Sequence, residues 1–457
     1  MSEPFFKLRS FPGHVWPPLP ASGNARVWSA YQSLTHSQWL APQDLLERQL
    51  QQIRALLQHC RQHVPYYRDQ FQKQAIEPEQ IRTLADFQRL PLLYRHDAQR
   101  HAGVLQARQL PQGTQATGAS STSGTTGEPL RVLYTNVTRL WWAALFLRDL
   151  EWCEMDPRGV IAVIRPMDQN IQSPKPRCVA GWQTGLNELI ESGPCHILST
   201  HAEPRQQMRW LLDVQPDYLL SSPSNLAHLA NFPEAAKLHR LRGIQAVHEA
   251  LPDTTRQQIE TRFGVPVRNT YSCEEAGYLA SPCPAGHGLH VHAENVLLEV
   301  LDENNQPCPP GQPGRVVLTL LQNYRSPFIR YMIGDIATPG PPCPCGRGLP
   351  LLTDIQGKTR PLLLLPNGQR RDPQVLMDLL IAQPLSRAFH QFQLVQESVD
   401  FFRIRLVPSP AYQATTATAL EHTVQTHLGF AVTVQIELVD RIPLHPNGKQ
   451  SGLIVNC

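Results

Sequence analysis

The stretch 120-SSTSGTTG-127 sets the expectations for the rest of this chain. It holds six hydroxyl side chains and two glycines, and an apolar segment, residues 130–134, follows it. Glycine lets backbone N–H groups converge without a Cβ in the way, and Ser and Thr add O–H donors, so the stretch suits a polyanion such as a nucleoside triphosphate. A flexible Ser/Gly linker is the alternative, and the β-prone segment that follows at once argues against it. No Lys-Ser or Lys-Thr pair closes the stretch as in a P-loop, so the cation for phosphate chemistry must come from elsewhere.

Length and composition indicate a globular protein of several domains. The 457 residues exceed one ordinary core, and 41 basic against 38 acidic residues leave a net charge of +3. This balance predicts neither a nucleic acid partner nor an anionic membrane partner. No run of about 18 apolar residues exists and the N-terminus lacks a signal-peptide pattern, so we expect no membrane span. The ten cysteines are scattered, which favours a reducing cytoplasm.

Strands and helices alternate through the middle of the chain, which predicts a mainly parallel α/β sheet. Before it, residues 1–41 show no clear period and are expected to form an irregular arm, and residues 42–64 show helical spacing and end at Pro65. Ligands bind at the carboxyl ends of parallel strands, where we expect residues 120–127, 248–249 and 271–277. The expected strands are 130–135, 160–164, 218–223, 244–247 and 267–271, and the expected helices are 138–153, 206–214, 225–231 and 254–263.

The pattern changes after residue 297. Residues 297–301 and 315–321 alternate in the manner of antiparallel strands and predict a β-rich unit. Further on, strands at 361–365 and 401–407 and a helix at 412–428 predict a separate C-terminal α+β domain of about 100 residues. The expected fold class is therefore α/β: a large multi-part N-terminal domain with mainly parallel sheets and a β-rich subdomain, and a small mobile α+β C-terminal domain.

Three further segments carry candidate chemistry. The adjacent carboxylates of 271-YSCEEAG-277 could hold Mg²⁺, or form a solvated acidic turn. Asp335, in 330-RYMIGD-335, could accept both hydroxyls of a ribose, or be an ordinary turn residue. Lys449, in 445-HPNGKQ-450, could be a mobile cation brought to a developing negative charge, or a solvated terminal lysine.

These segments, in this order, resemble the adenylate-forming enzymes that include acyl-CoA synthetases and luciferases, and above all the phenylacetate–CoA ligase-like branch. The resemblance covers about residues 45–455. It implies that Glu275 binds Mg²⁺, that Asp335 binds ribose and that Lys449 is catalytic. It further implies a nucleotide site that includes Tyr271, Ser272, the hinge residue Lys358 and the phosphate loop, whose residues are Ser121, Thr122, Ser123, Gly124, Thr125, Thr126 and Gly127. His248 and Glu249 are expected beside the adenine or acyl pocket.

The chain departs from the family pattern at the magnesium segment and at the hinge. Ser272 stands where Gly is common, and Glu274 stands where a hydroxyl usually contacts the α-phosphate, so the role of Glu274 stays open. Lys358 replaces Arg and loses its bidentate fork, and Arg360-Pro361 replaces an acidic pair. The resemblance implies an N-terminal adenylation domain over residues 1–357 and a C-terminal lid over residues 358–457.

A cysteine and histidine cluster predicts a structural zinc site within the β-rich unit, about residues 280–355. Cys343-Pro344-Cys345-Gly346 is a tight turn that can present two thiolates, and Cys283 with His290 would complete a tetrahedral Cys₃His site. His290 matches a position of the branch in which some members carry zinc, and His287 is the alternative fourth ligand. Free cysteines in proline-rich loops are the competing interpretation.

The resemblance implies ATP-dependent activation of a carboxylic acid as an acyl-adenylate, followed by transfer to a thiol. Coenzyme A is the first expected acceptor, and transfer to a carrier protein or an amine is the alternative. A non-catalytic, zinc-stabilised binding module is a further hypothesis. The identity of the acid is not readable, although an aryl or alkyl acid is preferred over an amino acid. The oligomeric state is open, with a homodimer as one option.

Overall fold

The computed structural model describes residues 4–122, 130–167, 175–183, 185–358, 363–371, 373–381, 385–442 and 452–457. Residues 123–127 of the expected phosphate loop, the hinge residues Arg360 and Pro361, and Lys449 lie outside these ranges. The side chains of Ser121, Thr122 and Lys358 lie outside the description as well.

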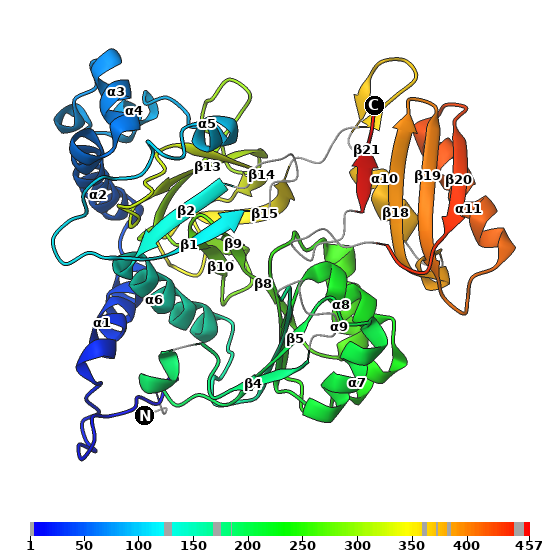
Figure 1. The fold of residues 1–457 in the computed structure, drawn as a ribbon, viewed down its shortest axis with the longest axis horizontal. Helices are drawn as coiled ribbons and strands as arrows, with labels where there is room; N and C mark the ends of the chain where they lie inside the picture. Colours follow the sequence, from blue (N-terminus) through cyan, green and yellow to red (C-terminus); the bar gives the residue numbers. More distant parts are fainter. Residues whose placement is uncertain are drawn as a thin grey trace.

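Six strands form a mostly parallel sheet in the order β4-β5-β3-β6-β7-β8, in which the edge strand β4 is antiparallel to β5 (Figure 1). Alternate residues of β3 face two cores, because successive side chains of a strand point to opposite faces. Helices α7, α8 and α9 cover one face, and α6 covers the other. The bounds are β3 Ile161–Arg165, β4 Arg177–Val179, β5 Cys195–Ser199, β6 Tyr218–Ser221, β7 Gly243–Ala246, β8 Val267–Asn269, α6 Asn136–Trp152, α7 Pro204–Val214, α8 Pro223–Ala230, α9 Asp253–Phe263, and the 3₁₀ turns η2 Leu186–Glu188 and η3 Pro233–Lys237.

A seven-stranded antiparallel sheet, larger than the sequence predicts, stands beside the parallel one. Its order is β12-β13-β14-β15-β11-β10-β9. The expected antiparallel strands at 297–301 and 315–321 are confirmed as the paired β12 and β13. The bounds are β9 Tyr271–Cys273, β10 Gly277–Pro282, β11 Leu289–Val291, β12 Val296–Leu301, β13 Gly314–Leu320, β14 Tyr331–Pro339 and β15 Leu351–Lys358.

Of the three placements at parallel strand ends, one proves wrong. The described residues of 120–127 end strand β1, Ala116–Thr122, which pairs antiparallel with β2, Leu130–Thr135, in a separate two-stranded ribbon. The physical cause is that short strands look alike in sequence whether their partner runs parallel or antiparallel. Residues 248–249 follow the parallel strand β7, and residues 271–277 follow the parallel strand β8. The latter then pass into the antiparallel sheet as β9, a turn and the start of β10.

The N-terminal arm is not irregular throughout, because residues 22–37 form helix α1. Val27, Trp28, Tyr31 and Leu34 lie at helical spacing and pack in one core with α6. The glycine at position 23 and the flanking prolines obscured this pattern. Pro65, expected to end the next helix, is also the first residue of α3, a position that tolerates a missing N–H. The bounds are α1 Ser22–Ser37, α2 Pro42–His63, α3 Pro65–Lys73, η1 Pro78–Gln80, α4 Leu84–Gln88 and α5 Arg95–Arg100.

The C-terminal residues form their own layer, drawn in orange and red in Figure 1. A four-stranded sheet in the order β20-β19-β18-β21 packs with α10 and α11 around a hydrophobic core of its own. The predicted strand at 401–407 and helix at 412–428 are confirmed as β19 and α11. The bounds are β16 Leu363–Leu364, β17 Arg370–Arg371, α10 Gln374–Ile381, η4 Leu385–Ala388, β18 Phe389–Ser398, β19 Phe401–Pro408, α11 Ala414–Leu428, β20 Thr433–Leu438 and β21 Leu453–Val455.

The expected α/β class is confirmed, with a parallel sheet, β-rich parts and a C-terminal unit. In the part of the chain that the structure describes, no helix combines the length and the apolar character that crossing a bilayer requires.

Candidate active site

Glu275 lies in the turn between β9 and β10 and is almost fully buried, with 4% of its surface exposed. Tyr331 donates its hydroxyl to Glu275 Oε1 at 3.2 Å, and Arg95 Nη1 lies 3.5 Å from the same oxygen. Burial and the Glu275 charge raise the pKa of Tyr331, so its hydroxyl stays protonated as a donor. Arg95 therefore offsets the cost of burying the Glu275 charge, and carboxylate oxygens are the ligands that Mg²⁺ takes from proteins.

Sequence reasoning missed Arg95. It begins helix α5, about 180 residues before Glu275, and nothing in its local sequence marks it as part of a site. The one available signal was its place shortly before the Ser/Thr/Gly stretch. Arg95 also makes the active-site charge less negative than the sequence segment 271–277 alone would predict.

Asp335 lies beside the Glu275 turn, in strand β14 rather than in the expected turn. Tyr271 donates its hydroxyl to Asp335 Oδ2 at 2.6 Å, and burial, with the Asp335 charge, raises the pKa of Tyr271. Gly334, directly before Asp335, has a φ of 90°, and the register between β14 and β15 shifts after Ile336. Lys358, the last residue of β15 and the first of the expected hinge, is the backbone partner of Asp335. Two predicted nucleotide-binding residues, Tyr271 and Asp335, are therefore in direct contact.

The ribbon β1–β2 contacts this turn through strand β1. Ser120, near the end of β1, donates its hydroxyl to the backbone oxygen of Glu274 at 2.8 Å. Glu274 itself is exposed and Ser272 is half-buried. Residues 123–127 of the expected phosphate loop lie outside the described residues, between the two paired strands in sequence.

Glu249 has an architectural contact. Its carboxylate accepts hydrogen bonds from the backbone N–H of Ser224, at 3.0 Å, and from the Ser224 hydroxyl, at 3.1 Å. Ser224 stands in the first turn of α8, where a carboxylate also interacts favourably with the helix dipole. His248, just before it, has a φ of 74°, an unusual conformation for a non-glycine residue. Together they turn the chain sharply at the carboxyl end of β7.

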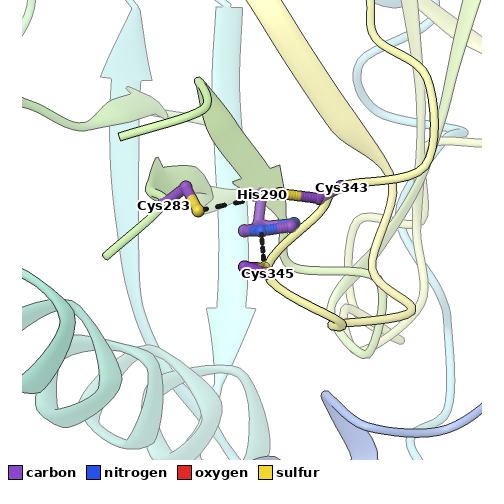
Figure 2. A group of neighbouring side chains, drawn as sticks. All are labelled: Cys283, His290, Cys343 and Cys345. Atoms are coloured by element: carbon purple, nitrogen blue, oxygen red, sulfur yellow. Dashed lines mark hydrogen bonds between the residues drawn. The ribbon is translucent and has the colours of Figure 1, made fainter. Parts of the chain in front are cut away.

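Three cysteines and one histidine come together as the sequence predicts (Figure 2). The potential ligand atoms of Cys283, His290, Cys343 and Cys345 all lie within 4.8 Å of one another. The Sγ atoms of Cys283 and Cys343 are 3.8 Å apart, too far for a disulfide, and His290 Nε2 lies 3.2 Å from Cys345 Sγ. Between the two histidines that the sequence left open, the geometry selects His290, since His287 is not among the four.

The protonation states of the cluster residues bear on their ability to bind a metal. Burial lowers the pKa of His290 to about 4, so its imidazole is neutral at pH 7 and able to ligate. Its Nδ1 faces the backbone oxygen of Leu349 at 3.3 Å, which orients the ring. Burial raises the pKa of Cys343 to about 11, a cost that a bound cation would offset by holding the thiolate. The residues present fit a closed tetrahedral Cys₃His set, which is characteristic of structural zinc.

Comparisons with known proteins assign the family. A family model described as AMP-binding enzyme matches residues 47–323, more than half of the chain. The chain belongs to the AMP-binding enzyme family. A second model, described as the CapK C-terminal domain, matches residues 375–456. The resemblance expected from the motifs is confirmed, as is the enzyme class of an adenylate-forming ligase that uses ATP.

Relatives of this AMP-binding enzyme include phenylacetate–coenzyme A ligases. That of Thermus thermophilus is 24% identical over 74% of this chain and 75% of its own length. That of Aromatoleum evansii is 22% identical over 87% of this chain and 91% of its own length. A crystal structure of 2-hydroxyisobutyryl-CoA ligase with an adenylate, described as the postadenylation state, covers 98% of this chain and 96% of its own, with a TM-score of 0.70 and 19% identity. At this identity the likeness establishes the fold alone.

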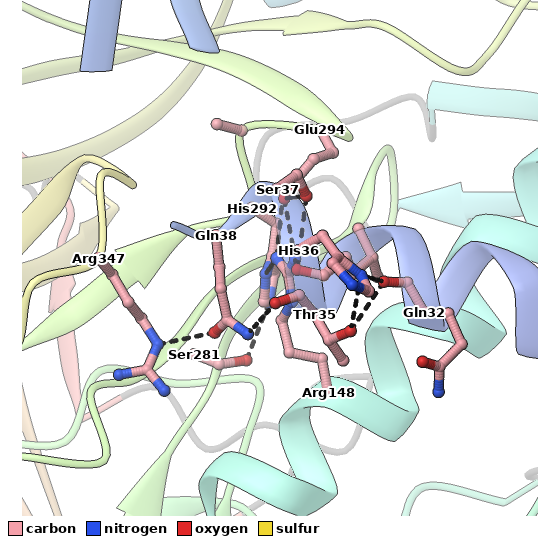
Figure 3. A network of polar contacts seen from close by, with 12 residues as sticks. Gln32, Thr35, His36, Ser37, Gln38, Arg148, Ser281, His292, Glu294 and Arg347 are labelled. Atoms are coloured by element: carbon pink, nitrogen blue, oxygen red, sulfur yellow. Dashed lines mark hydrogen bonds and ion pairs between the residues drawn. The ribbon is translucent and has the colours of Figure 1, made fainter. Parts of the chain in front are cut away.

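In this AMP-binding enzyme a polar network joins the end of the N-terminal helix α1 to Arg148 and to Arg347 (Figure 3). Arg347, two residues after Cys345, donates through Nε to Gln38 Oε1 at 2.8 Å, and its guanidinium lies 4.6 Å from the centroid of the Trp39 ring. Arg148 of α6 donates to the backbone oxygen of Leu34 at 2.6 Å and pairs with Glu294 at 2.8 Å. Burial works to raise the pKa of Glu294, but the Arg148 charge together with the hydrogen bonds from Arg148 and Ser37 outweighs it, so the pKa is lowered. The Arg148–Glu294 ion pair and the bond to Leu34 therefore help to hold the end of α1.

Proposed function

We propose that this protein activates a carboxylic acid with ATP, as an acyl-adenylate, and transfers the acyl group to the thiol of coenzyme A. The buried Glu275, adjacent to the phosphate-loop ribbon and to Asp335, carries the proposal, because it joins the parts of an adenylation site in a chain of the AMP-binding enzyme family. The relatives named phenylacetate–coenzyme A ligases support coenzyme A as the acceptor and an aryl acid as the first substrate to test.

In the first half-reaction a carboxylate oxygen attacks the α-phosphorus of ATP, the bond to the β-phosphate oxygen breaks, and pyrophosphate leaves. Ser123, Thr125 and Thr126 and their backbone N–H groups would hold the β- and γ-phosphates. Glu275 would hold Mg²⁺, which when bound neutralises phosphate charge. Asp335 would hold the ribose, and Lys449 would stabilise the charge that develops at the α-phosphate. Positioning and electrostatics would then supply most of the rate, because little covalent work falls to side chains.

In the second half-reaction the coenzyme A thiol loses its proton, its sulfur attacks the acyl carbon, and AMP leaves. The C-terminal residues 358–457 would rotate about the hinge at Lys358–Pro361 and withdraw Lys449 between the steps. The end of β15 at Lys358, opposite Asp335, supports a pivot that begins at the ribose site. The four residues Cys283, His290, Cys343 and Cys345 would hold one structural zinc ion, without a part in the chemistry.

The decisive experiment is a pyrophosphate-release screen over a panel of aryl, alkyl and amino acids, with and without coenzyme A. We expect release with one class of acid, and a thioester only when coenzyme A is present. Acid-dependent ATP–pyrophosphate exchange without a thioester would instead assign the acceptor to a carrier protein or an amine. Absence of ATP binding would leave the zinc-stabilised binding module as the function.

The matched variants are Lys449→Ala and Arg441→Ala, which each remove one cation from the same C-terminal segment. Lys449→Ala should reduce pyrophosphate exchange by roughly 100-fold or more, because it removes charge stabilisation at the transition state. Arg441 is exposed and has no proposed role, so its variant should retain exchange. Equal exchange in both variants would contradict the catalytic assignment of Lys449.

A further inference from the structure

A tryptophan of α6 donates a hydrogen bond to the turn that carries Glu275. Trp142 donates its indole N–H to the backbone oxygen of Ala276 at 2.7 Å. Asn295 donates a second hydrogen bond to the same oxygen, at 3.1 Å. The carbonyl of Ala276, the residue after Glu275, therefore receives two side-chain donors, one from α6 and one from the segment before β12, which defines the orientation of the Ala276–Gly277 peptide.

The indole of Trp142 also packs closely against this turn. Gly277, directly after Ala276, has a φ of 69°, and a Cβ built on it would lie 2.6 Å from Trp142 Nε1. That separation is far below van der Waals contact, so the indole lies directly against the glycine backbone. Trp142 and Glu275 also line one small cavity, together with Asn295 and Thr138. The Glu275 turn therefore packs directly on the Trp142 indole.

The same tryptophan contacts the ribbon that carries the phosphate loop. The rings of Trp142 and Tyr134, in β2, lie 5.0 Å apart between centroids. Tyr134 in turn donates its hydroxyl to the backbone oxygen of Ala119 in β1, at 3.2 Å. The hydrogen bond from Ser120 to the backbone oxygen of Glu274 is a second link between the ribbon and the turn. One side chain therefore touches both structures that would contact the ATP phosphates.

We propose that Trp142 is a positioning residue that holds the Glu275 carboxylate in register with the β1–β2 ribbon, so that the site distinguishes metal-bound from metal-free ATP. The inference rests on the proposed role of Glu275. Loss of the indole N–H would leave the Ala276 carbonyl held by Asn295 alone, and the carboxylate of the preceding residue would lose part of its alignment with the ribbon. Metal-dependent nucleotide binding should therefore suffer first, before stability or binding of the acid.

The test compares the affinity of the full-length protein for ATP with Mg²⁺ and for ATP with excess chelator of Mg²⁺, by displacement of a fluorescent ATP analogue. Trp142→Phe keeps an aromatic ring packed against the turn and removes the indole N–H. The neighbouring Trp141→Phe is the matched control, since Trp141 packs against the core that α6 shares with α1. We expect the ratio of the two affinities to fall by about 3- to 10-fold in Trp142→Phe, the size of one lost hydrogen bond, and to be unchanged in Trp141→Phe.

A ratio unchanged in Trp142→Phe would overturn the proposal, as would an equal loss of affinity with and without Mg²⁺. A wild-type protein that binds ATP equally in both conditions would instead contradict the role of Glu275, which separates the two failures. Ser120→Ala removes the hydrogen bond from β1 to Glu274 and keeps the Trp142 side chain. It therefore keeps the test valid if Trp142→Phe does not fold. That variant should lower the same ratio by a smaller factor, and no change in it would count against the coupling of ribbon and turn.

Discussion

At the scale of single residues, the candidate site depends on buried charges that are paired before any ligand binds. Glu275 is balanced by Arg95 and hydrogen-bonded by Tyr331, while Asp335 accepts from Tyr271. Such pairing offsets the desolvation cost of placing two carboxylates in one buried site. The neighbouring Glu274 is exposed, which explains how a second carboxylate is tolerated next to the site.

The variant Glu275→Gln tests this assignment directly. The amide retains the shape of the side chain and can still accept from Tyr331, but it loses the charge that would hold Mg²⁺. We expect acid-dependent pyrophosphate exchange to fall by roughly 100-fold or more, with a loss of only about 1 kcal/mol in unfolding free energy. Glu274→Gln removes the same charge one residue earlier and serves as the control. Comparable losses in the two variants would show that Glu275 has no special role.

At the scale of elements, the cysteine cluster fastens the N-terminal segment to the antiparallel sheet. The backbone N–H of Gly348 donates to the backbone oxygen of Gln38 at 2.9 Å, and a Cβ on Gly348 would lie 1.8 Å from the backbone oxygen of Leu40. The loop that presents Cys343 and Cys345 is therefore the surface on which residues 38–40 rest. We therefore expect a loss of order in this loop to be accompanied by a loss of order at the end of α1.

Removal of the metal should loosen α1. We expect wild-type protein to contain about one zinc per chain, and Cys345→Ser or a strong chelator to remove it. Trypsin should then cleave after Arg26, within α1, several-fold faster than in the loaded protein, as N-terminal sequencing of the fragments would record. Cys178→Ser changes an exposed cysteine outside the cluster and should leave the cleavage rate unchanged. Zinc loss without faster cleavage would separate the cluster from the helix.

At the scale of the whole molecule, a ring stack lies between the C-terminal layer and the rest of the described chain. Phe232, before η3, and His390, in β18, are parallel to within 3°, with centroids 6.1 Å apart. An aromatic pair contributes only about 0.5–1.5 kcal/mol beyond its buried area. A contact of this size can hold one domain arrangement and still allow the proposed rotation between the two half-reactions.

Phe232→Ala should therefore redistribute the domain arrangements without unfolding either part. Loss of about 1 kcal/mol corresponds to a shift of roughly fivefold in their populations. Nitroxide labels on the exposed Cys178 and Cys457 would report the change as a broadened or displaced distance distribution. Phe11→Ala, which truncates an exposed phenylalanine in the N-terminal arm, is the control. An identical distribution in Phe232→Ala would assign the arrangement to other contacts.

Acidic pH should weaken the same region. Burial, with a smaller effect from His390, lowers the pKa of His228 to about 4 from an ordinary value near 6.5. The folded state binds fewer protons than the unfolded state between these values, so the stability present above pH 6.5 is lost as the pH falls toward 4. We expect this loss to reach roughly 2–3 kcal/mol and to be absent in His228→Asn, measured as the difference between their melting midpoints across that window. Parallel pH profiles would contradict the assignment.

The linear sequence by itself determined the chemistry that this protein has available. The order of its motifs specified the family, the β-branched and apolar runs predicted most central strands and helices, and the Cys-Pro-Cys-Gly turn marked the cysteine cluster, because each of these signals is local. Partnerships across long separations could not be predicted in this way. That Arg95 pairs with Glu275, that Trp142 supports the turn, that His290 rather than His287 joins the cysteines, and that residues 271–277 belong to an antiparallel sheet were decided by tertiary packing. The physical reason is that a side chain's neighbours across the fold depend on how sheets and helices stack, a property of the whole chain that no short segment encodes.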